Sequence, residues 1–136
     1  MIEKSIIQYL MSDSSLLTLL GSSNIYPYRV PTEAKMPWIC INPLSGGTRE
    51  IITQKYTDTE QTVLIYIDAD NFLTGRQISQ KCLELIENYR GDMSDSFDVH
   101  LTCSPIRHID GYGGSYRFLF DVYTRFKEET VYPVSI

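Results

Sequence analysis

The chain has 136 residues, a length that suits one domain with a single hydrophobic core. Hydrophobic residues make up 43% of it, which argues against disorder, and a formal net charge of −5 argues against a nucleic-acid binder, which usually carries a basic patch. No apolar run reaches the ~18 residues that a membrane span needs and no signal peptide is recognisable, so we expect a cytoplasmic protein without a membrane partner.

The first twenty residues carry two short helical patterns. Apolar residues recur at helical spacing from Ile2 to Met11, and a leucine-rich pattern follows Asp13, a residue type suited to the N-cap. Gly21 ends this second pattern. We expect either one helix with a break near Ser12 or two short helices in sequence.

Two extended segments follow, separated by a proline-bounded arm. Residues 25–28 are short and contain a proline, which suits an edge strand, whereas residues 38–44 form a stronger strand pattern. Residues 45–60 are mostly polar apart from Ile51 and Ile52, and they fit either a hairpin or a long mobile loop. A polar segment of this length between two strands is more often functional or disordered than inert.

The strongest signal lies in residues 61–90. Alternating Val63, Ile65 and Ile67 predict a strand with one buried face. A helix then follows, because apolar residues recur every three or four positions; these are Ile78, Cys82, Leu85, Ile86 and Tyr89. Its expected caps are Asn71 or Thr74 at the start and Gly91 at the end. We expect the helix to pack on the strand, and we interpret Asp68 as serving the helix dipole.

The C-terminal third predicts a β-hairpin. Residues 91–96 are a polar loop, residues 99–106 and 115–126 alternate, and a glycine-rich turn at 110–114 joins them. One face of the last strand is mainly aromatic, and the other carries Arg117, Leu119, Asp121, Tyr123 and Arg125. Residues 127–136 lack a clear period, so we expect an extended C-terminal tail on a single domain that spans residues 1–136.

This order of elements predicts an α+β fold. We expect a mixed, mainly antiparallel sheet with two helices packed on one face and a long polar loop between strands. The opposite face carries Tyr, Thr, Arg and Asp, a mixture too aromatic for a purely solvated surface. It is therefore predicted to contact other subunits.

No recognisable catalytic or metal site stands out. His100 and His108 lie eight residues apart, ~26 Å along a regular strand, and the three cysteines are scattered and interpreted as reduced, buried side chains. The glycine-rich segments lack the downstream Gly-Lys-Ser/Thr of a phosphate loop, and no nucleophile elbow is present. The sequence therefore predicts a protein that is not an enzyme and that binds no metal or cofactor.

The order of the motifs resembles the tail-completion family of long-tailed phages. The matching features are Leu16-Leu17-Thr18-Leu19-Leu20-Gly21, Asn24-Ile25-Tyr26-Pro27, the arm with Val30-Pro31, the strand Met36-Pro37-Trp38-Ile39-Cys40-Ile41, the strand and helix of residues 63–89, and the aromatic strand of residues 117–123. The resemblance implies a tail terminator, also called a tail-to-head joining protein. Such a protein forms a hexameric ring on the tail tube, stops tube growth and presents a surface for head joining.

The resemblance also implies partners and a location. The partners are further copies of the chain, the tail tube protein and a head-completion or stopper protein, with DNA only passing through the bore. The protein is then expected in the host cytoplasm during assembly and in the virion afterwards. We predict a partner interface at Arg49, Lys55, Tyr56, Asp58, Arg117, Tyr123 and Arg125. Alternative functions are another head–tail connector component, such as a stopper, and a small-molecule-binding regulatory domain.

Overall fold

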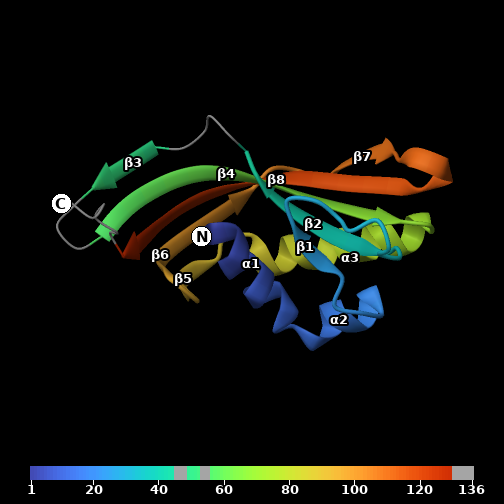
Figure 1. The fold of residues 1–136 in the computed structure, drawn as a ribbon, viewed down its shortest axis with the longest axis horizontal. Coiled ribbons are helices and arrows are strands. Elements are labelled where there is room, and N and C mark those ends of the chain that lie inside the picture. The colour runs from blue at the N-terminus through green and yellow to red at the C-terminus, as the bar shows by residue number, and fades with distance from the viewer. Residues whose placement is uncertain (45–48, 53–55, 130–136) are drawn as a thin grey trace.

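In the computed structural model, one twisted eight-stranded sheet carries three helices on one of its faces (Figure 1). The structure describes residues 1–44, 49–52 and 56–129. The helices are α1 (Ile2–Met11), α2 (Ser14–Leu20) and α3 (Phe72–Ile86). The strands are β1 (Ile25–Pro27), β2 (Trp38–Pro43), β3 (Arg49–Ile52), β4 (Tyr56–Ala69), β5 (Arg90–Met93), β6 (Ser96–Cys103), β7 (Arg107–Asp110) and β8 (Tyr116–Glu129). The predicted α+β fold is confirmed.

The centre of the sheet is a long antiparallel pair of strands, β4 and β8, each of 14 residues. The other edge of β4 pairs with β2 over one half of its length and with β3 over the other half. The other edge of β8 likewise pairs with β7 and with β6, which continues to β5. Among the strands that the structure describes, only the short edge strand β1 runs parallel to its neighbour, β2.

The core lies between the helices and one face of the sheet. The predicted packing of helix on strand is confirmed, since Ile78, Cys82 and Ile86 of α3 and the alternating apolar side chains of β4 are fully buried in one cluster. Leu85 lies at the border of that cluster and is only partly buried. Of the two expected N-caps, the structure uses Asn71, whose side-chain oxygen accepts a hydrogen bond from the Thr74 N–H at 3.1 Å.

The helix ends earlier than the apolar spacing predicts. The last helical residue is Ile86, and Glu87 already has an extended ψ of 128°, so Tyr89 lies outside the helix. Gly91, expected to end the helix, lies in β5, where a loop was predicted. The reason is that Tyr89 and β5 pair with β6: the Leu101 N–H donates to the Tyr89 carbonyl oxygen, and Arg90 lies opposite His100. Pairing with β6 therefore ends the helix before Gly91, the residue that the local sequence marks as its stop.

Three further boundaries differ from the sequence pattern. Residues 49–52 and 57–60 pair as a hairpin, which is the first of the two alternatives for this segment, while residues 45–48 and 53–55 lie outside the described residues. The predicted strand at 99–106 ends at Cys103, and a separate strand, β7, forms the tight hairpin with β8. Strand β8 continues to Glu129, so the first three residues of the expected tail belong to the sheet. Residues 130–136 lie outside the described residues.

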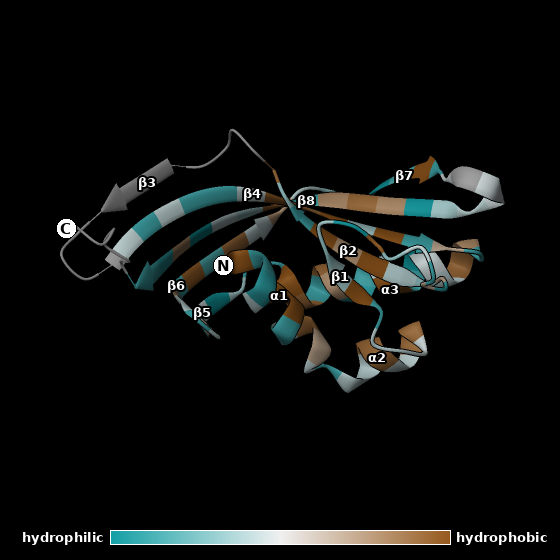
Figure 2. Cartoon of the chain, viewed as in Figure 1, coloured by the Kyte–Doolittle hydropathy of each residue, from teal (hydrophilic) through white to brown (hydrophobic). Residues whose placement is uncertain are grey.

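The sheet divides into an apolar half and a polar half. Figure 2 shows hydrophobic residues concentrated where the helices cover the sheet and hydrophilic residues along the first part of β4 and the last part of β8. In that polar half, Thr59 and Thr124 are still buried, and the Thr124 hydroxyl donates to the Gln61 carbonyl oxygen at 2.7 Å. In this half, main-chain hydrogen bonds and such polar contacts hold the strands together in place of a wide apolar face.

Candidate functional site

The sheet face opposite the helices, called here the outer face, is the surface on which several of the predicted interface residues lie. The strand register places side chains of neighbouring strands in rows, because directly paired residues point to the same face. One row contains Trp38, Asp68, Arg117 and Ile109 from β2, β4, β8 and β7. Rows nearer the other end of β4 contain Tyr123 and Arg125.

Asp68 and Arg117 form a well-bonded ion pair at one end of this face. The Arg117 Nε and Nη2 donate to the two carboxylate oxygens of Asp68 at 2.7 and 3.0 Å, and the Trp38 Nε1 donates to the same carboxylate at 2.8 Å. The Asp68 side chain is 6% exposed, and the Arg117 guanidinium lies 4.3 Å from the centre of the Tyr66 ring. The hydrogen bond to Asp68 raises the pKa of Arg117.

This pair changes the roles that the sequence suggested for both residues. Asp68 was interpreted as serving the helix dipole, but its carboxylate is bonded to side chains of β2 and β8 instead. Arg117 was predicted at the partner interface, but its guanidinium makes a bidentate pair of hydrogen bonds to Asp68 within the subunit. With 39% of its side chain exposed, Arg117 anchors Asp68 and stays partly accessible to solvent.

A shallow groove occupies the polar half of the outer face. It has a volume of about 320 Å³ and is lined by Glu60, Gln61, Thr62, His100, Thr102, Tyr123, Thr124 and Arg125. Tyr123 is 50% exposed, and the Arg125 side chain is 63% exposed. The Arg125 Nη2 lies 3.4 Å from the Asp58 carboxylate, an exposed ion pair that contributes little to stability. The groove therefore offers an aromatic ring, a guanidinium and several hydroxyl groups to a partner.

The structure brings together three of the seven predicted interface residues. Asp58, Tyr123 and Arg125 lie in or beside the groove. Arg117 lies six residues from Tyr123 along β8, ~20 Å away at the rise of a strand. Arg49 and Tyr56 are paired through the backbone with Glu60 and Glu129, and Lys55 lies outside the described residues.

Sequence reasoning missed the contribution of β6 to the groove. His100 lies opposite Arg125, and Thr102 lies opposite Tyr123. The alternation of residues 99–106 already assigned both residues to one face, but the register that places them beside Tyr123 depends on long-range pairing. Glu60 and Thr62 were also missed, because the sequence pattern places Glu60 in a loop and Thr62 at the end of a strand.

The described residues offer no group of three or more His, Cys, Asp or Glu side chains arranged to hold a metal ion. The three cysteines are free; burial raises the pKa of each thiol, and that of Cys103 reaches about 12. These thiols therefore stay protonated at neutral pH, which makes them poor nucleophiles. His108 makes an edge-to-face contact with Phe72 at 5.1 Å between ring centres, and His100 lies in a different strand beside the groove.

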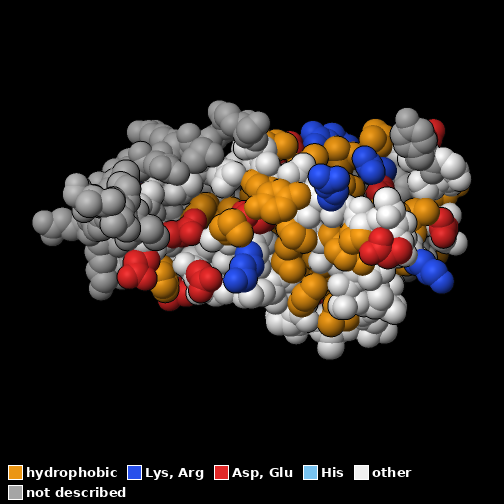
Figure 3. All heavy atoms as spheres, in the orientation of Figure 1, with side chains coloured by type: hydrophobic (Ala, Val, Ile, Leu, Met, Phe, Trp, Pro, Cys, Tyr) orange, Lys and Arg blue, Asp and Glu red, His pale blue; other side chains and the backbone are white. Residues whose placement is uncertain are grey.

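Surface charge is unevenly distributed on the face seen in Figure 3. Acidic side chains gather toward the end formed by β5 and β6, basic side chains gather over β2 and β7, and hydrophobic side chains lie between them. None of the helices formed by the described residues combines the length and the apolar character that crossing a bilayer requires.

Comparison with known proteins places this fold. Among solved structures, one chain of "Virion of native gene transfer agent (GTA) particle" is similar, with a TM-score of 0.66, 15% sequence identity and coverage of 94% of both chains. At that identity the likeness shows the fold alone. No curated protein matches the sequence. A family model described as "Tail completion protein gp17" matches residues 4–127. Because that match spans most of the sequence, the chain belongs to the tail completion protein gp17 family.

Proposed function

We propose that this protein is a tail terminator that caps the finished tail tube as a homohexameric ring. Membership of its family gives it a role in phage tail completion and a place in the virion. The proposed ring stops tube elongation and presents the surface to which the head joins. The observation that carries the proposal is the outer sheet face, which none of the described helices covers and whose polar half holds the groove with Tyr123 and Arg125.

A protein that acts by assembly needs contact surfaces rather than reactive groups. The groove combines Tyr and Arg, residue types enriched where binding energy is concentrated, with a rim of threonine and carboxylate side chains. In a closed ring every copy makes the same contacts, so a modest loss in each copy is multiplied around the ring. These properties fit a surface that contacts a neighbouring copy, the tube protein or the stopper protein.

The charge of the chain fits the proposed passage of DNA through the bore. A formal net charge of −5 leaves no excess of cations to neutralise phosphates, and counterion release is the main source of non-specific DNA affinity. DNA can thus pass an acidic wall without being retained. On this proposal the subunit is made in the host cytoplasm, where assembly takes place, and stays in the virion.

The predicted effect of changing the groove is a loss of joining without a loss of folding. The free energy of unfolding of the double variant Tyr123→Ala, Arg125→Ala should lie within about 1.5 kcal/mol of the wild-type value. The reason is that Tyr123 is half exposed and Arg125 makes an exposed ion pair. The yield of joined particles should fall at least about tenfold, because a hot-spot truncation costs over 1 kcal/mol in each copy. Circular dichroism and a head–tail joining assay on the same sample measure both properties.

The matched control changes one large apolar side chain and one arginine elsewhere. Leu73 and Arg76 of α3 are exposed and lie outside the groove. The control variant Leu73→Ala, Arg76→Ala should join heads at the wild-type level. A folded groove variant with normal yield would show that the partner surface lies elsewhere. Point substitutions test the groove more cleanly than a deletion of residues 49–58 would, because residues 56–58 pair with β8 and their removal would shorten the central strands.

A further inference from the structure

The segment between β1 and β2, residues 28–37, is called here the strap. Most of its residues are exposed, and it borders an open groove of about 500 Å³. The groove is lined by Leu20, Gly21, Ser22, Asn24, Tyr26, Glu33, Ala34, Lys35, Met36 and Pro37. One side of the groove is thus made by the end of α2 and by β1, and the other side is the strap itself.

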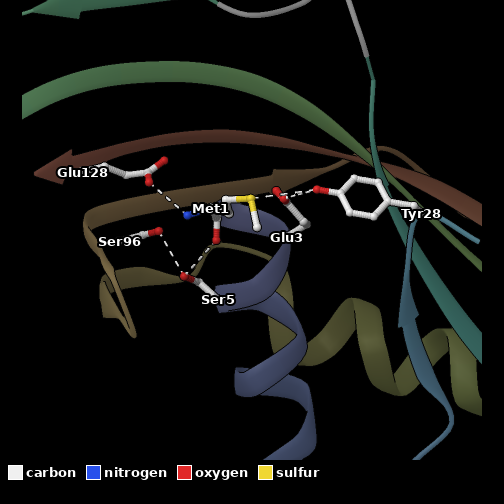
Figure 4. Close-up of polar contacts among 6 residues, drawn as sticks. All are labelled: Met1, Glu3, Ser5, Tyr28, Ser96 and Glu128. Carbon is white, nitrogen blue, oxygen red and sulfur yellow. Dashed lines mark hydrogen bonds and ion pairs between the residues drawn. The ribbon is translucent and has the colours of Figure 1, made fainter. Parts of the chain in front are cut away.

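Tyr28 fastens the first end of the strap to helix α1. Its hydroxyl donates to the Glu3 Oε1 at 2.7 Å, and Figure 4 shows the ring pointing toward the first turn of the helix. Glu3 is 5% exposed, whereas Tyr28 is 51% exposed. Tyr28 also has a φ of 65°, a left-handed conformation that residues other than glycine seldom adopt. A buried acceptor therefore holds an exposed donor whose backbone is in an unfavourable conformation.

The first turn of α1 is itself held in place, so it forms a firm base. The Ser5 and Ser96 hydroxyl oxygens lie 3.1 Å apart in a buried contact between α1 and β6. The Met1 amino group donates to the Glu128 carboxylate of β8 at 2.9 Å (Figure 4). Movement at this end of the strap is therefore expected at Tyr28 and not at Glu3.

Asn24 fastens the second end of the strap. Its Nδ2 donates to the Lys35 carbonyl oxygen at 2.9 Å, and its Oδ1 accepts a hydrogen bond from the Tyr26 hydroxyl at the same distance. At the first end, the Tyr28 N–H also donates to the Ile41 carbonyl oxygen of β2 at 3.0 Å, and the Arg29 N–H donates to the Pro27 carbonyl oxygen at 2.7 Å. Farther along, a backbone hydrogen bond internal to the strap runs from the Ala34 N–H to the Pro31 carbonyl oxygen. A segment held mainly at its ends opens at a lower free energy than the sheet beside it.

We infer that the strap is a latched flap that forms one wall of this groove and that the Tyr28–Glu3 hydrogen bond is its latch. Loss of the bond frees the Tyr28 side chain from α1, and the strap can then turn about the backbone hydrogen bond from the Tyr28 N–H to the Ile41 carbonyl oxygen of β2. Opening then widens the groove beside Asn24 and Tyr26, at the edge strand β1. The latch acts within one subunit, so it goes beyond the proposed ring and does not depend on it.

Cleavage by trypsin tests the latch directly, because the strap contains Arg29 and Lys35, neither of which precedes a proline. In the free subunit, Tyr28→Phe should raise the rate of cleavage at these two sites about fivefold, as expected when a hydrogen bond from a half-exposed hydroxyl to a carboxylate is lost. Glu3→Gln keeps an oxygen acceptor and should give a rate between those of the wild type and Tyr28→Phe. Cleavage at Arg76 and Lys81 in α3 reports global unfolding in the same digest.

The matched control is Tyr123→Phe, which removes the hydroxyl from a tyrosine of the outer face that is exposed to nearly the same extent, 50%. Its strap should be cleaved at the wild-type rate. Two results would overturn the inference: a strap in Tyr28→Phe cleaved no faster than in the control, or cleavage in α3 that accelerates as much as cleavage in the strap. Since the measurement uses the free subunit, a failed ring proposal leaves its outcome unaffected.

Discussion

Phe120→Ala is expected to destabilise the protein by about 3–5 kcal/mol, the largest effect of any substitution proposed here. Phe120 is fully buried at the centre of β8, lies opposite Ile65 of β4 and belongs to the core cluster beneath the helices. Truncation removes the burial of an aromatic ring and leaves a cavity that a well-packed core fills only in part. Urea unfolding followed by circular dichroism measures the loss as a lower midpoint at an unchanged slope.

The control for this substitution is Leu73→Ala. Leu73 is a large apolar residue of α3, but it is 61% exposed, so its truncation should change the free energy of unfolding by no more than about 0.5 kcal/mol. A loss below about 1 kcal/mol for Phe120→Ala would mean that the face of β8 assigned to the core is not packed against the helices.

Arg117→Ala is expected to destabilise the protein by about 2–3 kcal/mol. The substitution leaves the Asp68 carboxylate, 6% exposed, with the Trp38 N–H as its remaining side-chain donor among the described residues. Removing one partner of a buried ion pair costs about 3–5 kcal/mol, and we lower that value because 39% of the Arg117 side chain is in contact with solvent. Arg117→Lys should lose part of the same stability, since an ammonium group cannot bond both carboxylate oxygens in the planar, bidentate manner.

Arg125→Ala provides the comparison, because it removes an arginine from the same face of the same strand. Its carboxylate partner, Asp58, is 3.4 Å away and the arginine side chain is 63% exposed, so the expected loss is about 0–1 kcal/mol. Thermal or urea unfolding of both variants separates the two cases. Equal losses for Arg117→Ala and Arg125→Ala would contradict the anchoring role of the Asp68–Arg117 pair.

Those elements whose residues alternate or repeat strongly could be predicted from the sequence. The apolar faces of β4 and β8 and the apolar stripe of α3 are buried, and burying one face of an element requires apolar residues at a regular spacing in the sequence. Strand β5 (Arg90–Met93) leaves no such period, since three of its four residues are exposed. The first part of β4 was missed for a related reason: the strand there is maintained by pairing with β3 and β8, and its side chains are polar.

The candidate site was harder to predict than the fold because it depends on register. The alternation of β8 assigned Arg117, Tyr123 and Arg125 to one face, which the structure confirms. It could not show that Arg117 meets Asp68, which is 49 residues away in the sequence, or that His100 and Thr102 border the same groove as Tyr123. Such pairs are fixed by the positions of whole strands, and a local pattern carries no information about them.

The proposed function is tested most directly by electron microscopy of tails assembled with and without this protein. A terminator sets the point at which the tube stops, so tails made in its absence should be overlong and variable in length. Adding the purified protein during assembly should restore tails of uniform length with a six-membered ring on one end. Tails of normal, uniform length in the absence of the protein would contradict a terminator and indicate a component that acts after the tube is complete, such as a stopper.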